Sequence, residues 1–349
     1  MTRRKALAVL TAVLAVAFAL GVSACGKRED TGGTPQPRQL TLILDYLPNP
    51  DHVGIYMAQA RGEFRKAGLD VKIVTPTDPS APLKLLAAGR GDLAISYEPE
   101  FLLARDHNLG VLSIAALAQQ PLTSLMAVKD RSVDPKKLKG KRVGTAGVPY
   151  QEAYLDEILQ NADVDPATVK RVNVGFNLVP AMLSDKVDAT LGAFWNVEGV
   201  QLRLDRKRPS IAPVDTLGVP PYDELVLAAR YATVQHDGEM LRRFMQALQR
   251  GTRDARNDPQ AAADALIAAA PDLGRKFTEA SVKATIPVLF PEDRSRAFGF
   301  QNLQQWQDYA DWMRRNNLLT RPVDVGTVAT NEFLPGEGLG DVGSDPTAP

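Results

Sequence analysis

Aromatic side chains stand next to carboxylates at four places in this chain of 349 residues. The four clusters are Asp45 with Tyr46, Tyr97 with Glu98, Trp195 with Glu198, and Tyr222 with Asp223 and Glu224. A flat ring can stack on a planar molecule, and a carboxylate can accept hydrogen bonds from amino groups on that molecule. The clusters therefore predict a binding site for a planar heterocycle that carries amino groups.

The segments around these clusters alternate between strand and helix patterns. Strands are predicted at 40–44, 71–74, 93–95 and 111–117, with helices at 52–60, 82–88 and 98–106. A second series has strands at 139–144, 172–174 and 189–191, with helices at 151–160 and 179–183. This alternation favours a parallel sheet with helices on both faces. Two such series predict two α/β lobes with a cleft between them.

The clusters follow predicted strands, and ligands of open α/β sheets bind at the carboxyl ends of strands. Candidate ligand-binding residues at these positions are Asp45, Tyr46, Asn49, His52, Tyr97, Glu98, Tyr150, Trp195, Asn196, Glu198, Asp223 and Glu224. We expect Trp195 and Glu198 to be the most important of them. The alternative for any single one is a helix N-cap or a solvated loop residue.

The remainder of the chain is mostly helical in pattern. Helices are predicted at 239–256, 261–270 and 301–316. Trp306, Tyr309 and Trp312 recur at helical spacing, which predicts core packing rather than ligand stacking. Residues 336–349 are rich in Gly, Asp and Pro and are predicted to form a disordered tail.

The first residues have the pattern of a secretory signal peptide. Arg3, Arg4 and Lys5 precede the apolar run 6–22, and small residues lead up to Cys25. This arrangement resembles the bacterial lipobox, which implies cleavage after residue 24 and a lipid on Cys25. Residues 25–38 would then be a flexible, lipidated tether. We expect an exported protein anchored to the outer face of the cell membrane; the alternative for Cys25 is a buried free thiol.

Composition and missing motifs exclude several classes of protein. Lys plus Arg and Asp plus Glu both number 41, so no basic excess exists to bind nucleic acid. The single cysteine excludes a disulfide scaffold, and His52, His107 and His236 are isolated, which argues against a metal site. Residues 338–343 match GxGxxG without the strand and helix that a dinucleotide site needs. The sequence predicts a binding protein with no cofactor rather than an enzyme.

Two segments near the start of the body resemble a known family. They are 44–60, which begins Leu-Asp-Tyr-Leu-Pro-Asn-Pro-Asp-His, and 62–71. They are similar to the opening of a periplasmic-binding-protein family. This family holds the ABC-importer receptors for thiamine pyrimidine precursors, the related pyrimidine synthase and the alkanesulfonate receptors. The resemblance extends over about residues 39–330.

The resemblance implies a two-lobed, type II-like periplasmic binding protein of the α/β class. Each lobe would be a mixed sheet flanked by helices, with the ligand cleft between the lobes. Lobe 1 would hold 39–128 and 227–335, and lobe 2 would hold 129–226, with crossings near Lys129 and Val226. A monomer would close around its ligand by a hinge motion and deliver it to an ABC permease with its ATPase.

The synthase branch of the family provides an internal comparison. That enzyme is expected to carry a lysine for pyridoxal phosphate and a histidine just after the third strand. The corresponding positions here look like Ser96 and Glu100. Its cysteine-rich motif is replaced by Pro-Pro-Tyr-Asp-Glu at 220–224. The resemblance therefore favours the binding branch.

The favoured ligand is an aminopyrimidine such as hydroxymethylpyrimidine or formylaminopyrimidine. By family analogy Tyr46, Tyr97 or Trp195 would stack on the ring, while Asp45, Glu98 and Glu198 would accept from its nitrogens, with Asn49 and His52 at the rim. Riboflavin or another planar heterocycle remains an alternative. A sulfonate or taurine fits less well, because anions call for Arg, Lys or helix N-termini. A synthase-like enzyme is disfavoured.

Overall fold

The computed structural model describes residues 36–336. The predicted signal peptide, Cys25, nearly all of the tether and the tail from residue 337 lie outside the described residues. No helix among residues 36–336 is long and apolar enough to cross a membrane.

The first sheet has five strands in the order β2-β1-β3-β10-β4. The strands are β1 (Arg38–Ile43), β2 (Leu69–Val74), β3 (Leu93–Ser96), β4 (Val111–Ala118) and β10 (Leu225–Arg230). Strand β1 pairs in parallel with β2 and β3, whereas β10 runs antiparallel to β3 and β4. Strands β3 and β4 are buried along their whole length, as expected for a sheet covered on both faces.

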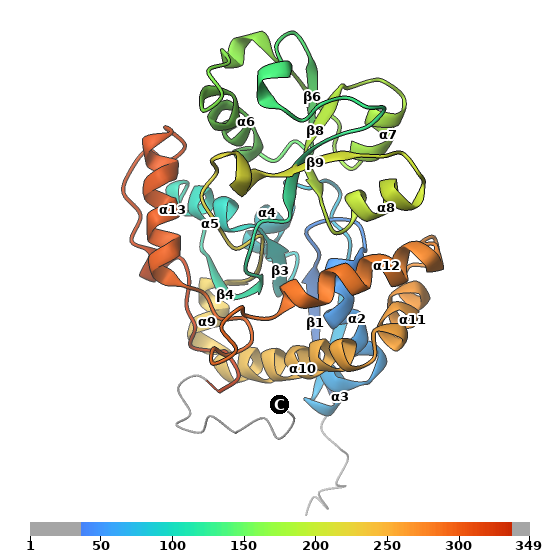
Figure 1. Ribbon diagram of the computed structural model, residues 1–349. Helices are drawn as coiled ribbons and strands as arrows, with labels where there is room; N and C mark the ends of the chain where they lie inside the picture. The colour runs from blue at the N-terminus through green and yellow to red at the C-terminus, as the bar shows by residue number, and fades with distance from the viewer. Residues whose placement is uncertain (1–35, 337–349) are drawn as a thin grey trace, which may run out of the picture. The chain divides into compact units, whose positions relative to one another are not determined.

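The second sheet repeats this arrangement, with the order β7-β6-β8-β5-β9. Its strands are β5 (Thr123–Ala127), β6 (Arg142–Thr145), β7 (Lys170–Asn173), β8 (Ala189–Phe194) and β9 (Ser210–Pro213). Strand β6 is parallel to β7 and β8, and β5 is antiparallel to β8 and β9. Figure 1 shows the second sheet above the first, each with helices around it. The predicted two-lobed α/β fold is confirmed.

The alternation pattern alone is wrong about strand direction, because each sheet contains one antiparallel strand. These are β5 and β10, the first strands that the chain forms after passing between the sheets. A strand that enters directly from the other lobe has no crossover helix to bring it in parallel. The mixed sheets implied by the family resemblance are the correct description.

The chain crosses between the sheets earlier than predicted. Strand β5 belongs to the second sheet, so the first crossing lies at 119–122 rather than near Lys129. The return lies at 218–224, just before β10 and close to the predicted Val226.

Short helices connect the strands of each lobe. In the first lobe these are η1 (Pro50–His52), α2 (Val53–Ala60), α3 (Glu63–Lys66), α4 (Pro82–Ala87) and α5 (Glu98–Asp106). In the second lobe they are η2 (Pro135–Lys137), α6 (Tyr150–Gln160), η3 (Pro166–Thr168), α7 (Leu178–Leu183), α8 (Glu198–Leu204) and η4 (Val214–Leu217). Several begin at the carboxyl end of a strand, which is where the predicted site residues stand.

The helices after β10 build up the first lobe. They are α9 (Tyr231–His236), α10 (Gly238–Asn257), α11 (Pro259–Ala269), α12 (Arg275–Thr285), η5 (Ile286–Leu289), α13 (Leu303–Arg315) and η6 (Val325–Thr327). Helix α10 packs against α2, where Gly251 lies against the backbone of Ala58. A glycine is needed there because a Cβ atom at residue 251 would collide with that backbone.

Helix α13 links the lobes without a covalent connection. It packs against α5 of the first lobe, and the ring of Trp312 contacts the ring of Tyr154 on α6 of the second. The hydroxyl groups of Tyr154 and Tyr309 are hydrogen bonded. In Figure 1 this helix runs along one side of the body. Trp306, Tyr309 and Trp312 are buried, so their predicted core role is confirmed.

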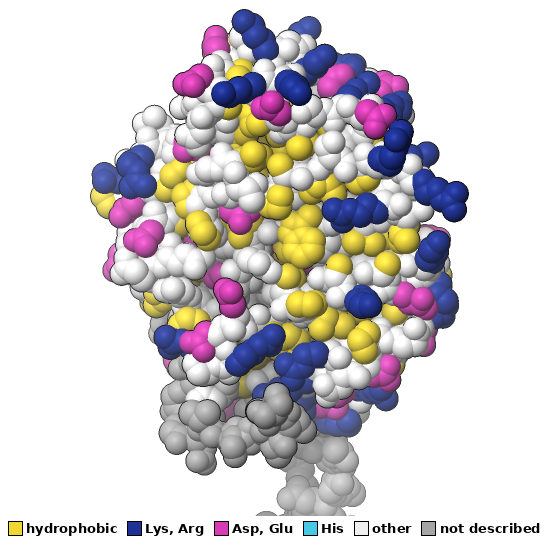
Figure 2. Space-filling view, in the orientation of Figure 1, with side chains coloured by type: hydrophobic (Ala, Val, Ile, Leu, Met, Phe, Trp, Pro, Cys, Tyr) yellow, Lys and Arg dark blue, Asp and Glu magenta, His cyan; other side chains and the backbone are white. Residues whose placement is uncertain are grey.

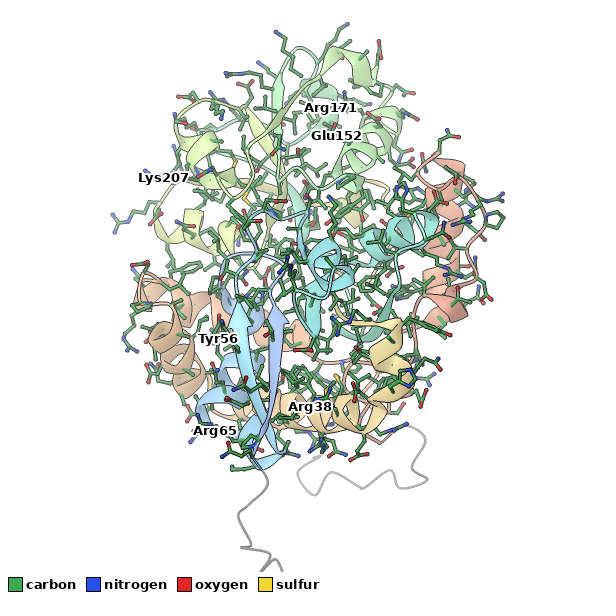
Figure 3. The ribbon with its side chains drawn as sticks, turned by 180° about the vertical axis from the view of Figure 1, so that it is seen from behind. Arg38, Tyr56, Arg65, Glu152, Arg171 and Lys207 are labelled. Carbon is green, nitrogen blue, oxygen red and sulfur yellow. The ribbon has the colours of Figure 1, made fainter. Side chains whose placement is uncertain are left out.

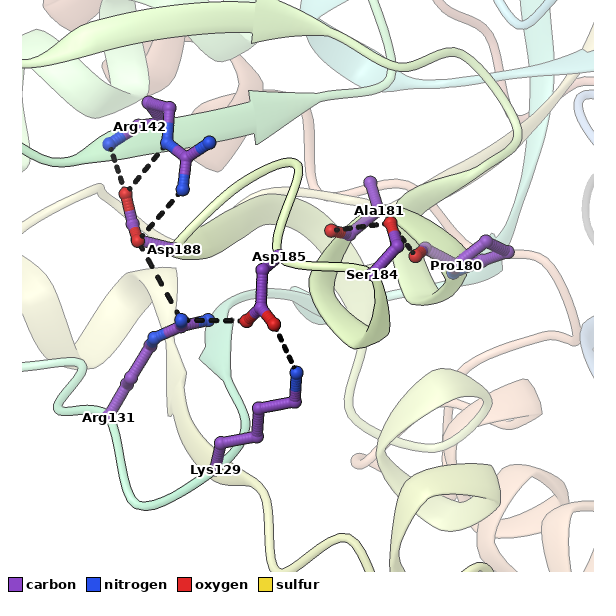
Figure 4. Close-up of polar contacts among 8 residues, drawn as sticks. All are labelled: Lys129, Arg131, Arg142, Pro180, Ala181, Ser184, Asp185 and Asp188. Carbon is purple, nitrogen blue, oxygen red and sulfur yellow. Dashed lines mark hydrogen bonds and ion pairs between the residues drawn. The ribbon is translucent and has the colours of Figure 1, made fainter.

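The two lobes share a local motif that the sequence also repeats. In each lobe a helix ends in a left-handed residue, Gly89 (φ 72°) or Asp185 (φ 60°), three residues before an aspartate. Asp92 accepts from the backbone N–H of Thr41 at 2.8 Å. Asp188 accepts from the N–H of Arg142 at 2.9 Å (Figure 4). Each aspartate therefore ties the start of one parallel strand to its neighbour.

Ion pairs on the surface join neighbouring elements of each lobe. Seen from behind, Arg171 on β7 lies beside Glu152 on α6, and the two are 2.7 Å apart (Figure 3). At the start of β1, Arg38 forms a two-pronged pair with Asp237 at 2.8 and 2.9 Å. On the face shown in Figure 2, basic and acidic side chains are interspersed, and apolar side chains gather toward the middle. Exposed ion pairs contribute little to stability, so buried packing must hold the lobes together.

Candidate functional site

A cavity with about 370 Å³ of empty space, part of it open to solvent, lies between the two sheets at the carboxyl ends of β1, β3, β6 and β8. Its wall combines residues of both lobes with several aromatic rings. The lining residues are Tyr46, Asn49, Tyr97, Ala146, Val148, Tyr150, Gln151, Gly192, Phe194, Val197 and Glu198.

Tyr46 contributes an unsatisfied hydroxyl group to this wall. Its ring meets Phe176 edge to face, with the centroids 4.6 Å apart. Its hydroxyl is buried and has no hydrogen-bond partner among the described residues. Burial raises the pKa of this phenol above its ordinary value, so the group stays protonated. A buried polar group without a partner is costly, and a bound molecule could supply the missing hydrogen bond.

Tyr97 and Tyr150 bring the two lobes together at the cavity. One follows β3 and the other begins α6, and their rings meet edge to face with centroids 5.8 Å apart. Burial raises the pKa of both phenols well above the ordinary value. Both rings therefore offer neutral aromatic surface to a planar molecule.

Glu198 places a carboxyl group on the second lobe's side of the wall. It is the first residue of α8, and one of its oxygens, Oε2, accepts from the N–H of Phe194 at 2.7 Å. Its other oxygen, Oε1, accepts no hydrogen bond from another residue in the described range. Burial raises the pKa of this carboxyl to about 7, although hydrogen bonds from the backbone N–H groups of Phe194 and of Glu198 itself lower it. At neutral pH Glu198 is therefore balanced between its protonated and ionised forms.

Asp45 and His52 support the wall from behind. The hydroxyl of Tyr97 donates to Asp45 at 2.9 Å, and His52 Nε2 lies 2.8 Å from the other Asp45 oxygen. The backbone N–H of Asn49 donates to His52 Nδ1 at 3.2 Å, which places the ring proton on Nε2. Both carboxylate oxygens of Asp45 are thereby occupied. The sequence predicts that Asp45 and His52 touch the ligand, but neither is on the cavity wall.

Glu224 joins the two crossings instead of lining the cavity. Its carboxylate accepts from the backbone N–H groups of Leu122 at 2.7 Å and Thr123 at 2.8 Å. The hydroxyl groups of Thr123 and Tyr222 donate to it as well. Burial raises its pKa to about 7 despite these four donors. The Glu224 side chain therefore joins the first crossing, at 119–122, to the return crossing, at 218–224, by hydrogen bonds.

Glu98 and Asp223 form a second buried pair beside the crossing. The N–H of Asp223 donates to Glu98 at 2.6 Å, and Trp306 Nε1 donates to Asp223 at 2.7 Å. Burial raises the pKa of Glu98 well above its ordinary value and that of Asp223 to about 7. Both residues are buried, and neither lines the cavity.

Trp195 and Asn196 also lie outside the cavity wall. The indole N–H of Trp195 donates to the carbonyl of Pro121 at 3.2 Å, so its ring covers the first crossing. The amide of Asn196 donates to Asp51 at 2.6 Å and to Thr285 at 2.7 Å. Asn196 thus connects the second lobe to η1 and α12 of the first.

The wall therefore contains only part of the predicted set. Tyr46, Asn49, Tyr97, Tyr150 and Glu198 are brought together on it. The sequence does not predict the remaining wall residues, which are Ala146, Val148, Gln151, Gly192, Phe194 and Val197. Most of these stand at the carboxyl ends of β6 and β8, so strand position is a usable signal for them. Their apolar or amide side chains, however, do not match the carboxylate pattern.

The described residues do not include a metal-binding cluster, and the positions compared with the synthase do not hold its lysine and histidine. Among residues 36–336, no three His, Cys, Asp or Glu side chains are placed to hold a metal ion. At the positions compared with the synthase, Ser96 donates to Glu100 at 2.6 Å, and both side chains are buried. Burial raises the pKa of Glu100 to about 7.

Two mixed sheets in the same order, with a cavity between their strand ends, define the two-lobed α/β fold of periplasmic binding proteins. The alkanesulfonate-binding protein SsuA of Xanthomonas axonopodis pv. citri superimposes with a TM-score of 0.66 at 17% identity. That match covers 84% of this chain and 99% of SsuA. At that level of identity the similarity shows the fold alone.

The chain belongs to the NMT1/THI5-like family, whose profile matches residues 49–262. It is 33% identical over 286 residues to a formylaminopyrimidine-binding protein of Halalkalibacterium halodurans, covering 81% of this chain and 86% of the relative. It is 24% identical over 311 residues to a 4-amino-5-hydroxymethyl-2-methylpyrimidine phosphate synthase of Saccharomyces cerevisiae, covering 85% and 88%. The family thus includes both a binding protein and an enzyme.

Proposed function

We propose that this protein is the extracytoplasmic solute-binding lipoprotein of an ABC importer and that it binds a thiamine pyrimidine precursor. The observation that carries the proposal is the Glu198 carboxyl on the wall of a small, tyrosine-rich cavity between the lobes. The similarity to a formylaminopyrimidine-binding protein supports the same ligand class. Hydroxymethylpyrimidine and formylaminopyrimidine are the two candidates.

The wall residues match the chemistry of an aminopyrimidine. Tyr97 and Tyr150 contribute ring surface, and Oε1 of Glu198, the oxygen that Phe194 does not bond, accepts from the exocyclic amino group. The hydroxyl of Tyr46 supplies a further hydrogen bond. Asp45 and His52 act by holding Tyr97 and the 45–52 loop in place.

The cavity wall disfavours an anionic ligand. None of the described residues on its wall is Lys or Arg, and Glu198 would repel a sulfonate. A taurine or alkanesulfonate receptor is therefore a weaker proposal than a pyrimidine receptor.

A binding role is also preferred to catalysis. The positions that look like the synthase lysine and histidine hold Ser96 and Glu100, which are hydrogen bonded to each other. The segment 220–224 carries Tyr222, Asp223 and Glu224 where the synthase has cysteines, and these residues are engaged in bonds at the crossing. No amine is available at these positions for a Schiff base with pyridoxal phosphate.

We propose further that the lobes close around the ligand by a hinge motion. The crossings stapled by Glu224 serve as the hinge. Asn196, bonded to Asp51 and Thr285, forms a latch between the lobes when they meet. A ligand that contacts both lobes stabilises this closed form by its differential affinity for it. The closed monomer then docks on the permease and ATPase subunits.

Titration calorimetry of the chain from Gly26 onward tests the ligand class. Hydroxymethylpyrimidine, formylaminopyrimidine, riboflavin and taurine are titrated separately. Saturable binding of the pyrimidines alone is expected, and Glu198→Gln should weaken it by about 1–3 kcal/mol. Glu239→Gln, which changes an exposed glutamate of α10, is the matched control. Binding of taurine or riboflavin in place of the pyrimidines would overturn the assignment.

The lipid anchor is tested on the full-length chain in a bacterial host. Incorporation of labelled fatty acid and recovery in the membrane fraction are expected for the wild type. Cys25→Ser should abolish both, because the thiol is the proposed attachment point. Labelling that persists in the variant would place the lipid elsewhere.

A further inference from the structure

The side-chain amide of Gln151, on the cavity wall, has an unambiguous orientation. Gln151 Oε1 accepts from the backbone N–H of Ala146 at 2.9 Å. A backbone N–H can only donate, so this bond identifies the oxygen and leaves Nε2 as the outward donor. Nε2 donates no hydrogen bond to any residue in the range 36–336, although the side chain is only 3% exposed. This donor, from a residue on the cavity wall, therefore has no hydrogen-bond partner among the described residues.

Gly192 on β8 makes room for this amide. Its φ of 118° lies in the region that favours glycine, and a Cβ atom there would stand 2.5 Å from Gln151 Nε2. Both residues are on the cavity wall. Gly192 therefore allows the amide to occupy the wall in the orientation that Ala146 sets.

Glu198 is oriented in the same way, by a backbone N–H that binds one of its side-chain atoms, but it offers an acceptor where Gln151 offers a donor. A backbone N–H, that of Phe194, donates to one of its oxygens and leaves the other as an acceptor. The second lobe thus presents one oriented donor and one oriented acceptor to the same cavity. This pair complements a ring nitrogen next to an exocyclic amino group. A 4-oxopyrimidine presents the reverse pattern, a carbonyl acceptor beside a ring N–H.

We propose that Gln151 is a specificity-determining residue, which donates to the ring nitrogen beside the amino group and so selects 4-aminopyrimidines against 4-oxopyrimidines. The proposal rests on the pyrimidine-binding function argued above. A site that forms a hydrogen bond with one analogue leaves its own buried group unpaired with the other, and discriminates strongly for that reason. Gly192 is a positioning residue that acts through Gln151.

The test compares 4-amino-5-hydroxymethyl-2-methylpyrimidine with its 4-oxo analogue by calorimetry. The wild type should prefer the amino compound by at least about 100-fold. Gln151→Glu replaces the outward donor by an acceptor and should reduce affinity for the amino compound by about 10- to 100-fold. Gly192→Ala, which leaves every polar group in place, should lower the same affinity by displacing the amide.

A charge-neutral exchange provides the sharpest variant. In the double variant Gln151→Glu/Glu198→Gln, both backbone N–H groups still bind an oxygen, so the outward donor and acceptor change places. The preference should then shift toward the 4-oxo compound, while circular-dichroism melting shows that the fold is kept. If Gln151→Glu and the double variant both prefer the 4-amino compound as strongly as the wild type does, the role of Gln151 is refuted and the pyrimidine function is not. Failure of the wild type to bind either pyrimidine would refute the pyrimidine function together with this inference.

Discussion

Ligand binding should become tighter as the pH rises through neutrality, because Glu198 must be ionised to accept fully from an amino group. Burial raises the pKa of this carboxyl to about 7. With that value it is about 10% ionised at pH 6 and about 90% ionised at pH 8. If only the ionised form binds well, the association constant rises about tenfold between these two values.

Calorimetric titrations at pH 6, 7 and 8 measure this rise directly. Glu198→Gln removes the titrating group and should flatten the profile, whereas Glu239→Gln should leave it unchanged. Titration of the ligand's own ring nitrogen contributes equally to all three proteins, so the difference between the profiles isolates Glu198. The other carboxyls with a pKa near 7, those of Glu100, Asp223 and Glu224, stay in place in the variant. A wild-type profile as flat as that of Glu198→Gln would refute the reasoning.

Three further predictions concern the closed form and the core. Asn196→Ala removes the amide that bonds Asp51 and should weaken pyrimidine binding about tenfold by calorimetry; an unchanged affinity would exclude the latch. Because burial raises the pKa of Glu224 to about 7, its stabilising contribution is present below about pH 4.5 and is lost as the pH rises through 7. The loss of stability between pH 5 and 8, measured by urea unfolding, should therefore be smaller in Glu224→Gln than in the wild type by an amount on the order of 2–3 kcal/mol; equal losses in the two proteins would contradict this. Gly251→Ala should destabilise the protein by about 1–3 kcal/mol despite alanine's higher helix propensity, since its Cβ meets the backbone of Ala58; a raised melting temperature would refute the close contact.

The internal repeat explains why the two lobes are predictable from the amino-acid pattern. The Asp92 and Asp188 motifs depend on neighbouring residues in sequence, namely a helix end, a left-handed residue and an aspartate that starts a strand. The pattern is readable because the helix end, the left-handed residue and the aspartate are close in sequence, although each aspartate bonds a strand about 50 residues earlier in the chain. The same reason makes the positions of Tyr46, Tyr97 and Tyr150 at strand ends predictable.

The antiparallel strands are not predictable in the same way. Strands β5 and β10 are short, buried segments next to the crossings, and their direction depends on which lobe the chain comes from. A short apolar run shows that a strand is buried but not how it pairs. The sequence therefore predicts the first crossing near Lys129, too late along the chain.

The amino-acid pattern is enough for the alternating strands and helices, the two-lobed α/β class and the family, and it places Glu198 at a strand end where the structure has a cavity. The folded arrangement sets what each polar side chain does there. The side chains of Glu224 and Trp195 could bind a ligand as well as those on the cavity wall could. However, residues 121–123, which are distant in sequence, already form hydrogen bonds with them. Gln151 is a candidate only because Ala146 binds its oxygen and Gly192 leaves space for its nitrogen. The sequence gives the chemical type of each side chain. Whether that side chain is available to a ligand depends on the neighbours that folding brings into contact with it.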